Sequence, residues 1–355
     1  MVGTTLRGCP DAGGHTGPPL RKAWPLYPEL FMYKDKILNL LRQSRSGFLS
    51  GEELAMKLGI SRTMVWKHIK ALEGEGFGIE AVPSQGYRIT SAPDLLRQDD
   101  IKRGLKTRSI GREIYLYAEV VSTNTQAMEL ASKGAPEGTV LIAETQTGGK
   151  GRLGRKWMSP KGNLYFSVVL RPDLPTHKAP LLTLMAAVAV ASAIRKTCSV
   201  QAVIKWPNDI LVSGKKVSGL LTEMSAEPDR IKHIALGIGV DVNMPIDELP
   251  PDIREFATTL AAEAGKKIDR TMLLQQILRE LDSRYRVLLQ SEADVLGEWE
   301  ELNVTIGRRV SVSGSREVLE GLAQGIDREG RLIVRLDDGS LRQVAAGDVT
   351  ILKRA

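Results

Sequence analysis

The chain has 355 residues, 42% of them hydrophobic, which is long enough for two or three domains with substantial cores. Its formal net charge of +7 makes nucleic acid or nucleotide phosphates candidate partners without establishing either. The two cysteines, Cys9 and Cys198, lie far apart, which excludes a disulfide framework or a cysteine-rich metal site and fits a reducing cytoplasm.

The N-terminal segment, residues 1–33, is rich in Gly and Pro and lacks the continuous apolar core of a signal peptide. We expect it to be a disordered extension. The longest apolar run, residues 181–194, is too short to span a bilayer and is followed by Arg195 and Lys196. We therefore expect a buried helix there, no membrane segment and a cytoplasmic protein.

Residues 34–91 have the pattern of a winged helix-turn-helix domain. Apolar residues at helical spacing begin after Lys34, Ser50 and Glu53 form a capping box for a second helix, and a third helix follows. An alternating segment around residues 84–86 predicts a two-stranded wing. The outward side of the third helix would offer these residues to a DNA major groove: Ser61, Arg62, Thr63, Trp66, Lys67 and Lys70. A helical protein-interaction module is the alternative.

Residues 92–303 predict a central α+β domain with a mainly antiparallel or mixed sheet. Strand patterns and helical patterns follow one another without the strict alternation of a parallel sheet. The strand patterns lie at 113–120, 139–146, 202–225 and 231–243, and the helical patterns at 122–134 and 270–290. Residues 304–355 contain short strands with Gly and Asp-Gly turns, which fits a small SH3-like β-barrel. The predicted fold class is therefore multidomain α+β.

A glycine-rich stretch, residues 145–157 (TQTGGKGRLGRKW), matches the pattern G-x-G-x-x-G and nearly matches a Walker A loop. Both motifs need a helix directly after the loop, but residues 157–170 contain helix-breaking Ser-Pro and Gly-Asn pairs and then a strand pattern. We predict a strand, a loop and a strand. Glycines let an anion approach the backbone amides, and four cations would neutralise it: Lys150, Arg152, Arg155 and Lys156. A solvated basic hairpin loop is the alternative.

From about residue 34 onward, the chain resembles the bifunctional biotin protein ligases that also repress the biotin operon. Each short motif is weak by itself, whereas their order and spacing together are specific. The motifs are STN (122–124), GGKGRLGRKW (148–157), KWPND (205–209), KKVSGLL (215–221) and GIGVDVN (237–243), set between the winged helix and the barrel.

The resemblance implies that ATP activates biotin to biotinoyl-5′-adenylate, and that biotin passes to a lysine of the biotin carboxyl carrier protein of acetyl-CoA carboxylase or a similar carboxylase. The implied catalytic residues are Arg152 and Lys216. The implied biotin-binding residues are Ser122, Thr123, Asn124, Gln146, Lys150, Gly151, Arg152 and Lys216, and the implied nucleotide-binding residues are Gly149, Arg155, Trp157, Asn208 and Asp209. Mg²⁺ is expected on the polyphosphate, with no metal site indicated among protein side chains.

Two positions depart from the family pattern. Lys150 stands where arginine is usual, which keeps the charge but loses the planar fork, and Asp241 adds a negative charge where asparagine is usual. Chemistry alone does not show which of two neighbouring lysines, Lys215 or Lys216, is the active-site lysine. Without the resemblance, Ser122 would be interpreted as a helix cap.

The resemblance also implies operator DNA as a partner and a homodimer whose adenylate-bound form represses transcription. One alternative is a biotin-sensing repressor without ligase activity; the intact loop cations and Lys216 argue against it. A second alternative is a lipoate protein ligase; the winged helix and the motif series argue against it. The four histidines do not cluster in sequence and Cys198 lies in an apolar segment, so no cysteine nucleophile is indicated.

Overall fold

The computed structural model describes residues 28–44, 47–313 and 318–352. Most of the expected disordered extension, residues 1–27, lies outside the described residues. For residues 28–33 the expectation of disorder is wrong, because helix α1 spans Pro28–Gln43. Proline fits the first turn of a helix, where the N–H that it lacks would have no partner. The described chain forms two compact units that meet in sequence at Leu95 and Leu96.

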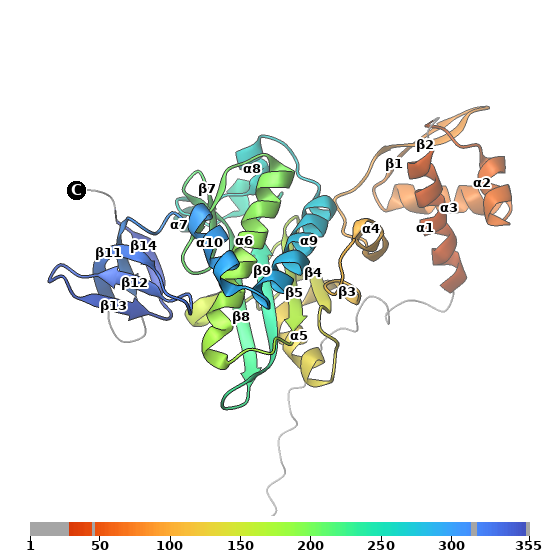
Figure 1. The fold of residues 1–355 in the computed structure, drawn as a ribbon. Coiled ribbons are helices and arrows are strands. Elements are labelled where there is room, and N and C mark those ends of the chain that lie inside the picture. The colour runs from red at the N-terminus through yellow and green to blue at the C-terminus, as the bar shows by residue number, and fades with distance from the viewer. Residues whose placement is uncertain (1–27, 45–46, 314–317, 353–355) are drawn as a thin grey trace, which may run out of the picture. The chain divides into compact units, whose positions relative to one another are not determined.

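The first unit is a winged helix-turn-helix, as predicted (Figure 1). It contains α1, α2 (Gly51–Leu58) and α3 (Arg62–Gly74), followed by the antiparallel strands β1 (Gly78–Val82) and β2 (Gly86–Ser91). Ser50 caps α2, because its Oγ accepts a hydrogen bond from the Glu53 amide at 3.0 Å, whereas the Glu53 carboxylate pairs with Lys57 at 2.7 Å. Gly86 has a φ of 112°, and a Cβ there would lie 2.0 Å from the Leu49 carbonyl oxygen, so this turn requires glycine.

The second unit is built on a mixed sheet of seven strands in the order β3-β4-β5-β9-β8-β7-β6. Only β3 and β4 run parallel; every other neighbouring pair is antiparallel. The strands are β3 (Ile114–Val120), β4 (Val140–Gln146), β5 (Leu164–Leu170), β6 (Ala202–Lys205), β7 (Asp209–Val212), β8 (Lys215–Ala226) and β9 (Ile231–Val240). The mixed sheet confirms the predicted class of this domain.

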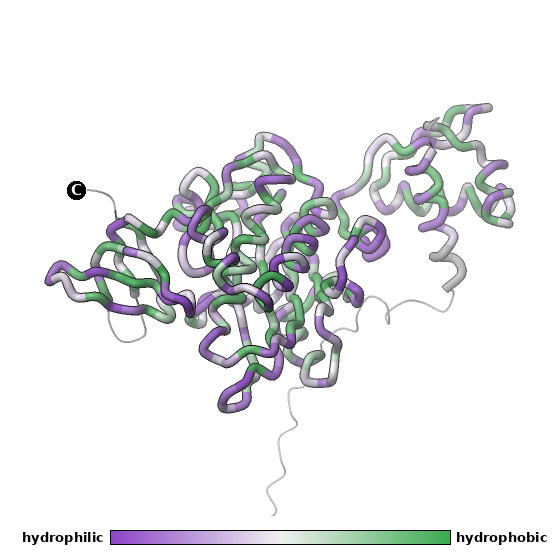
Figure 2. Tube along the Cα trace, viewed as in Figure 1, coloured by the Kyte–Doolittle hydropathy of each residue, from purple (hydrophilic) through white to green (hydrophobic). Residues whose placement is uncertain are grey.

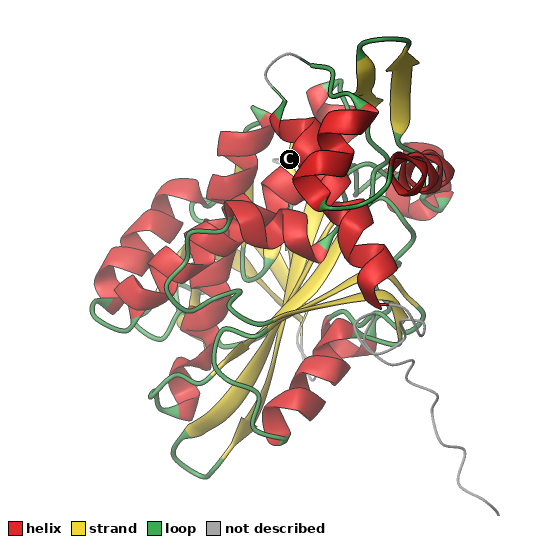
Figure 3. Ribbon diagram, turned by 90° about the vertical axis from the view of Figure 1, so that its right-hand side faces the viewer, coloured by secondary structure: helices red, strands yellow, loops and turns green. Residues whose placement is uncertain are grey.

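Helices cover both faces of this sheet, as Figure 3 shows. Strand side chains alternate between the faces, so Val140 and Ile142 join the large core while Leu141 and Ala143 pack in the smaller core under α5. Helix α5 is Thr123–Ser132; the large core is covered by α6 (Ala179–Cys198), on which α9 (Arg270–Leu288) and α10 (Glu292–Leu302) pack. Hydrophobic residues concentrate along the central strands and α6 (Figure 2).

The segment Thr176–Cys198 is long and apolar enough to cross a membrane by composition, but 72% of its apolar window is buried inside the fold. A buried environment explains its composition, and the predicted buried helix is confirmed. Burial also raises the pKa of the Cys198 thiol to about 11, so the thiol stays protonated at neutral pH.

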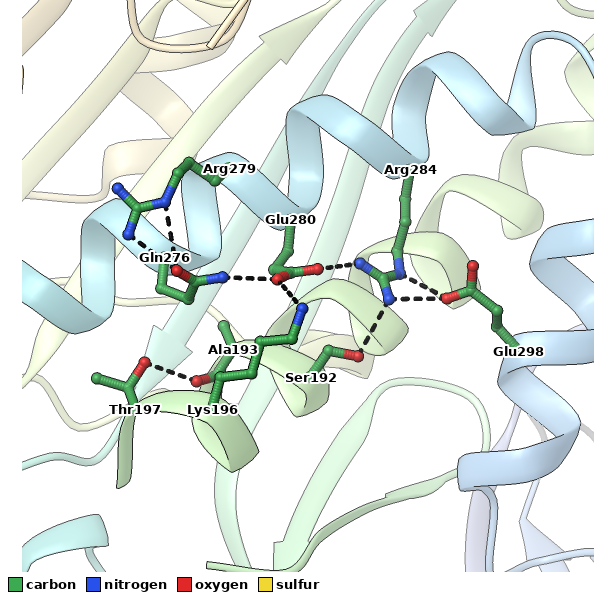
Figure 4. A network of polar contacts seen from close by, with 9 residues as sticks. All are labelled: Ser192, Ala193, Lys196, Thr197, Gln276, Arg279, Glu280, Arg284 and Glu298. Atoms are coloured by element: carbon green, nitrogen blue, oxygen red, sulfur yellow. Dashed lines mark hydrogen bonds and ion pairs between the residues drawn. The ribbon is translucent and has the colours of Figure 1, made fainter. Parts of the chain in front are cut away.

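A polar network joins α6, α9 and α10 on the outside of this helical layer (Figure 4). The carboxylate of Glu280 accepts hydrogen bonds from Lys196 at 2.7 Å, from Gln276 at 2.6 Å and from Arg284, which also reaches Glu298 at 2.8 Å. Burial acts to raise the pKa of Glu280, but these hydrogen bonds outweigh it and hold the pKa below its usual value. The network ties α6 to the consecutive helices α9 and α10, which lie far from it in sequence.

Shorter helices fill the connections: α4 (Gln98–Gly104), α7 (Pro251–Arg254) and α8 (Leu260–Ala264), with the 3-10 turns η1 (Arg152–Gly154), η2 (Thr176–Lys178) and η3 (Ile246–Glu248). Five antiparallel strands complete the unit: β10 (Arg309–Ser313), β11 (Val318–Ile326), β12 (Leu332–Arg335), β13 (Leu341–Val344) and β14 (Asp348–Ile351). Their order is β13-β12-β11-β10-β14, in agreement with the predicted small C-terminal β domain.

Candidate active site

A cavity of about 510 Å³ opens at the glycine-rich loop and brings distant sequence motifs together. Its wall contains every residue that we predicted to bind biotin or nucleotide except Gly149: Ser122, Thr123, Asn124, Gln146, Lys150, Gly151, Arg152, Arg155, Trp157, Asn208, Asp209 and Lys216. Gly149 lies behind the wall, where its carbonyl accepts a hydrogen bond from the Trp157 amide at 2.9 Å and a Cβ would lie 2.5 Å from the Trp157 carbonyl oxygen. Its contribution is close backbone packing of the loop.

One part of the cavity is a group of uncharged hydrogen-bonding side chains at the start of α5. Ser122 is the N-cap, as the alternative interpretation proposed, and it also lines the cavity. The backbone N–H of Thr123 donates to Gln146 Oε1 at 2.8 Å, and Gln146 Nε2 donates to Ser159 Oγ at 2.9 Å. These bonds orient the Gln146 amide, because its oxygen faces donors and its nitrogen faces an acceptor.

Asn124 is almost fully buried beside this group, and its amide is oriented by its partners. Its Nδ2 donates to the Leu221 carbonyl oxygen at 3.2 Å and to Glu223 Oε2 at 2.9 Å, while its Oδ1 accepts from Ser167 Oγ at 2.6 Å. A Cβ on Gly237 would lie 2.2 Å from Asn124 Oδ1. Glycine at 237 is therefore needed for the asparagine to occupy this place.

The glycine-rich loop connects two antiparallel strands, as predicted, with only the single 3-10 turn η1 inside it. Arg152 Nη1 donates to Asn208 Oδ1 at 3.2 Å and to the Gly347 carbonyl oxygen at 3.1 Å. Arg155 forms an ion pair with Asp348. Burial lowers the pKa of the Arg152 guanidinium from its usual value, although Asp348 and Asp209 oppose this change. The loop is thus anchored to the C-terminal β domain by two arginines.

A second part of the cavity gathers charged side chains from two motifs, KWPND and KKVSGLL. Asp209 pairs with Lys216 at 2.5 Å and with Lys205 at 2.9 Å. Burial acts to raise the pKa of Asp209, but the two lysines outweigh it and hold the pKa below its usual value. Lys215 Nζ instead donates to the Arg254 carbonyl oxygen at 3.0 Å and is not part of the cavity wall. The geometry therefore distinguishes the two neighbouring lysines.

Trp157 forms a flat apolar wall beside these charges. Its ring lies 5.2 Å from Lys216 Nζ, and a Cβ on Gly219 or Gly239 would come within 2.8 Å or 2.7 Å of the indole. The indole Nε1 is buried and has no hydrogen-bond partner among the described residues. The two glycines make room for the ring against the sheet.

Asp241 lies at the end of β9 in the cavity wall and is buried. Asn163 Nδ2 donates to its Oδ1 at 3.3 Å. Burial raises the pKa of Asp241 to about 7, against the opposing effect of Lys216. The departure from the family pattern thus places a carboxyl that is only partly ionised at neutral pH near the lysine.

The structure adds three residues that sequence analysis did not identify: Glu223, Ser167 and Lys205. Glu223 and Ser167 contact Asn124 because helix α5 packs on the sheet, and Lys205 contacts Asp209 because β6 pairs with β7. The sequence does not indicate the packing of α5 on these strands. No group of three or more His, Cys, Asp or Glu side chains suited to a metal ion occurs within residues 28–44, 47–313 and 318–352. Carboxylates lie beside two of the loop cations: Asp348 pairs with Arg155, and Glu223 Oε1 lies 3.7 Å from Lys150 Nζ.

The predicted DNA-binding residues lie on one exposed side of α3. Ser61 is the N-cap and accepts a hydrogen bond from the Met64 amide at 3.2 Å. Arg62, Thr63, Trp66, Lys67 and Lys70 are all exposed, whereas Val65, His68, Ile69 and Leu72 face the core. Lys70 also pairs with Glu73 at 2.6 Å on the surface.

Comparisons with known proteins match three parts of the chain. The Biotin/lipoate A/B protein ligase family model matches residues 117–241, an HTH domain model matches 34–88, and the Biotin protein ligase C terminal domain model matches 305–352. The bifunctional ligase/repressor BirA of Bacillus subtilis is 40% identical over 317 residues, covering 89% of this chain and 97% of that protein.

Two further comparisons cover about 70% of the chain. The biotin--[acetyl-CoA-carboxylase] ligase of Mycobacterium tuberculosis is 34% identical over 273 residues, covering 73% of this chain and 98% of that protein. The structure of biotin protein ligase from Aquifex aeolicus in complex with biotin and ATP is similar with a TM-score of 0.59 and 30% identity, covering 68% of this chain and all of that one.

Proposed function

The chain belongs to the family of bifunctional biotin protein ligases and repressors, and we propose that it activates biotin with ATP and transfers it to a lysine of the biotin carboxyl carrier protein of acetyl-CoA carboxylase or a similar carboxylase. The observation that carries the proposal is the single cavity in which an uncharged hydrogen-bonding group and a group of cations meet. A neutral ureido ring and an anionic carboxylate with phosphates need these two environments.

We assign the uncharged group to the biotin ring. Ser122, Thr123, Asn124 and Gln146 offer donors and acceptors whose orientations are already fixed, and such preorganisation lowers the cost of binding. Lys150, Gly151, Arg152 and Lys216 are assigned to the side chain and carboxylate of biotin. Gly149, Arg155, Trp157, Asn208 and Asp209 are assigned to the nucleotide, with Gly149 acting through loop packing.

In the first step, a biotin carboxylate oxygen attacks the α-phosphorus of ATP and pyrophosphate leaves. Arg152 and Lys216 would neutralise the charge that accumulates as these anions meet. In the structure both cations are held by protein acceptors, Asn208 and Asp209 respectively, so the incoming oxygens compete with these partners. In the second step, the acceptor lysine amine attacks the acyl carbon and AMP leaves.

We propose Mg²⁺ on the polyphosphate, where it would offset negative charge. Mg²⁺ is commonly held by one or two carboxylates together with substrate phosphates rather than by a protein cage. Asp209, which lines the cavity and has an unusually low pKa, suits this role because it stays ionised at neutral pH. The other ligands would come from phosphate oxygens and water.

We propose that the winged helix binds operator DNA as part of a homodimer on a palindromic site, because one recognition helix rarely supplies enough affinity and specificity. The adenylate-bound dimer would repress the biotin operon, and acceptor protein would lift repression by consuming the adenylate. Any ligand that promotes dimerisation must bind the dimer more tightly than the monomer. This activity places the protein in the cytoplasm, where ATP and operator DNA are found.

Biotin-dependent release of pyrophosphate from MgATP tests the first step. Release of pyrophosphate by the purified chain would support the ligase activity, whereas biotin binding without release would support only a biotin-sensing role.

Sedimentation and DNA binding at fixed salt test the repressor activity. We expect biotin with MgATP to promote the dimer and tighten operator binding, with a strong salt dependence from Arg62, Lys67 and Lys70. An operator affinity that these ligands leave unchanged would show that the two units are not coupled.

A further inference from the structure

A continuous series of hydrogen bonds joins the two ends of the glycine-rich loop through the proposed biotin-ring residues. It starts after the loop at Ser159, which accepts from Gln146 Nε2, and Gln146 Oε1 in turn accepts from the backbone N–H of Thr123 at 2.8 Å, so that the Thr123 hydroxyl can donate to Ser167. Ser167 Oγ lies 2.8 Å from Thr123 Oγ1 and 2.6 Å from Asn124 Oδ1, bridging these two neighbours. The series therefore reaches Asn124 through two residues of the cavity wall, Gln146 and Thr123, and two serines behind it.

Glu223, on β8, carries the series from Asn124 back to the start of the loop. Its Oε2 accepts from Asn124 Nδ2 at 2.9 Å, and its Oε1 lies 3.7 Å from the ammonium of Lys150. Glu223 is not part of the cavity wall, so it acts on a ligand only through other side chains. One carboxylate thus contacts both a buried biotin-ring residue and a loop cation.

We propose that Glu223 is a positioning residue that couples the biotin-ring end of the cavity to closure of the glycine-rich loop, by orienting the Asn124 amide and holding Lys150. This inference rests on the proposed function of the cavity. The carboxylate is the important chemical form, because it accepts hydrogen bonds at both oxygens and cannot donate. A donor here would allow the Asn124 amide to rotate and would turn its oxygen away from Ser167.

The chemistry of Lys150 makes this coupling specific to the chain. A lysine ammonium is a compact charge on a flexible stem, whereas the arginine usual in the family could make a bidentate contact with a carboxylate. At 3.7 Å the Lys150–Glu223 pair is electrostatic rather than a short hydrogen bond, and both side chains are partly exposed. We therefore expect the loop contact to be weak alone and the Asn124 contact to be the larger part of the effect.

The test compares biotin affinity and catalysis in full-length E223Q, E223A, K150M and the double variant E223Q/K150M. Calorimetry with biotin alone should show affinity reduced by about 3-fold to 5-fold in E223Q and by about 10-fold or more in E223A. At saturating biotin and MgATP, the rate of pyrophosphate release by E223Q and E223A should stay within about 3-fold of wild type, because Glu223 lies outside the cavity wall. K150M should weaken biotin binding in the wild-type background and much less in the E223Q background.

Glu227 provides a matched control, since it forms a similar but more exposed pair with Lys232 at 3.8 Å on the same β8–β9 hairpin. E227Q should bind biotin as wild type does. Wild-type affinity in E223Q and E223A, or additive effects of E223Q and K150M, would overturn the coupling. E223Q keeps the shape of the side chain, so the test stands even where E223A fails to fold. Failure of the wild-type chain to bind biotin would instead refute the proposed function.

Discussion

Replacing the buried carboxyl of Asp241 with an amide should stabilise the second unit at alkaline pH and much less at acidic pH. Burial raises the pKa of Asp241 from an ordinary 3.8 to about 7 in the folded chain. Because the folded chain binds this proton more tightly than the unfolded chain, the protonated carboxyl stabilises the fold fully below the unfolded-state pKa. That stabilisation is lost as the pH rises to the folded-state pKa. Asparagine does not titrate, so D241N avoids this loss.

The size of the effect follows from the shift. A difference of about 3 units corresponds to roughly 4 kcal/mol at about 1.36 kcal/mol per unit, lost between about pH 4 and 7. Part of that loss has already occurred at pH 5, so the stability of D241N relative to wild type should increase by roughly 2 to 3 kcal/mol between pH 5 and pH 8. The amide keeps the oxygen that accepts from Asn163, and its N–H replaces the donor of the protonated acid.

Denaturant unfolding at both pH values, followed by tryptophan fluorescence, measures this change. Trp206 and Trp299 are buried in the second unit and report its transition. The exposed Asp229, in the β8–β9 turn, is the control, and D229N should show no such pH dependence. A stability difference between D241N and wild type that is the same at pH 5 and pH 8 would refute the reasoning.

Three further predictions concern the cavity. R152A should reduce biotin-dependent pyrophosphate release about 100-fold to 1000-fold, because it removes the cation that we propose to face the developing charge, and a folded variant with the wild-type rate would contradict this role. K216A should impair ligation while K215A should not, since only Lys216 lines the cavity; greater sensitivity at Lys215 would show that the assignment is displaced by one residue. G237A should weaken biotin binding by about 10-fold or more in calorimetry, because its Cβ would lie 2.2 Å from Asn124 Oδ1, and unchanged affinity would exclude Asn124 from the site.

Local chemistry allowed much of the fold to be predicted from the sequence. The helix cap at Ser50, the turn at Gly86 and the strands flanking the glycine-rich loop depend on residues near one another in sequence. Helix α10 was missed because Gly297 lowers its helix propensity, and burial of Val295 and Trp299 provides the compensating stability.

The site was harder to predict where it depends on strand register. Asn124 and Glu223 are 99 positions apart and meet because α5 packs on β8 and β9. The choice between Lys215 and Lys216 depends on a register shift between β7 and β8 next to Ile210 and Leu211. Such a shift reverses which side chains face the cavity, and no local pattern indicates it.

Transfer of biotin to protein tests the central claim most directly. The purified full-length chain is incubated with biotin, MgATP and a biotinyl acceptor domain, alongside an acceptor whose target lysine is replaced by arginine, and the products are probed with streptavidin. We expect labelling of the intact acceptor only when biotin and MgATP are both present. No labelling by a folded chain that binds biotin, or equal labelling of the lysine-free acceptor, would contradict the assignment of this cavity as a biotin ligase site.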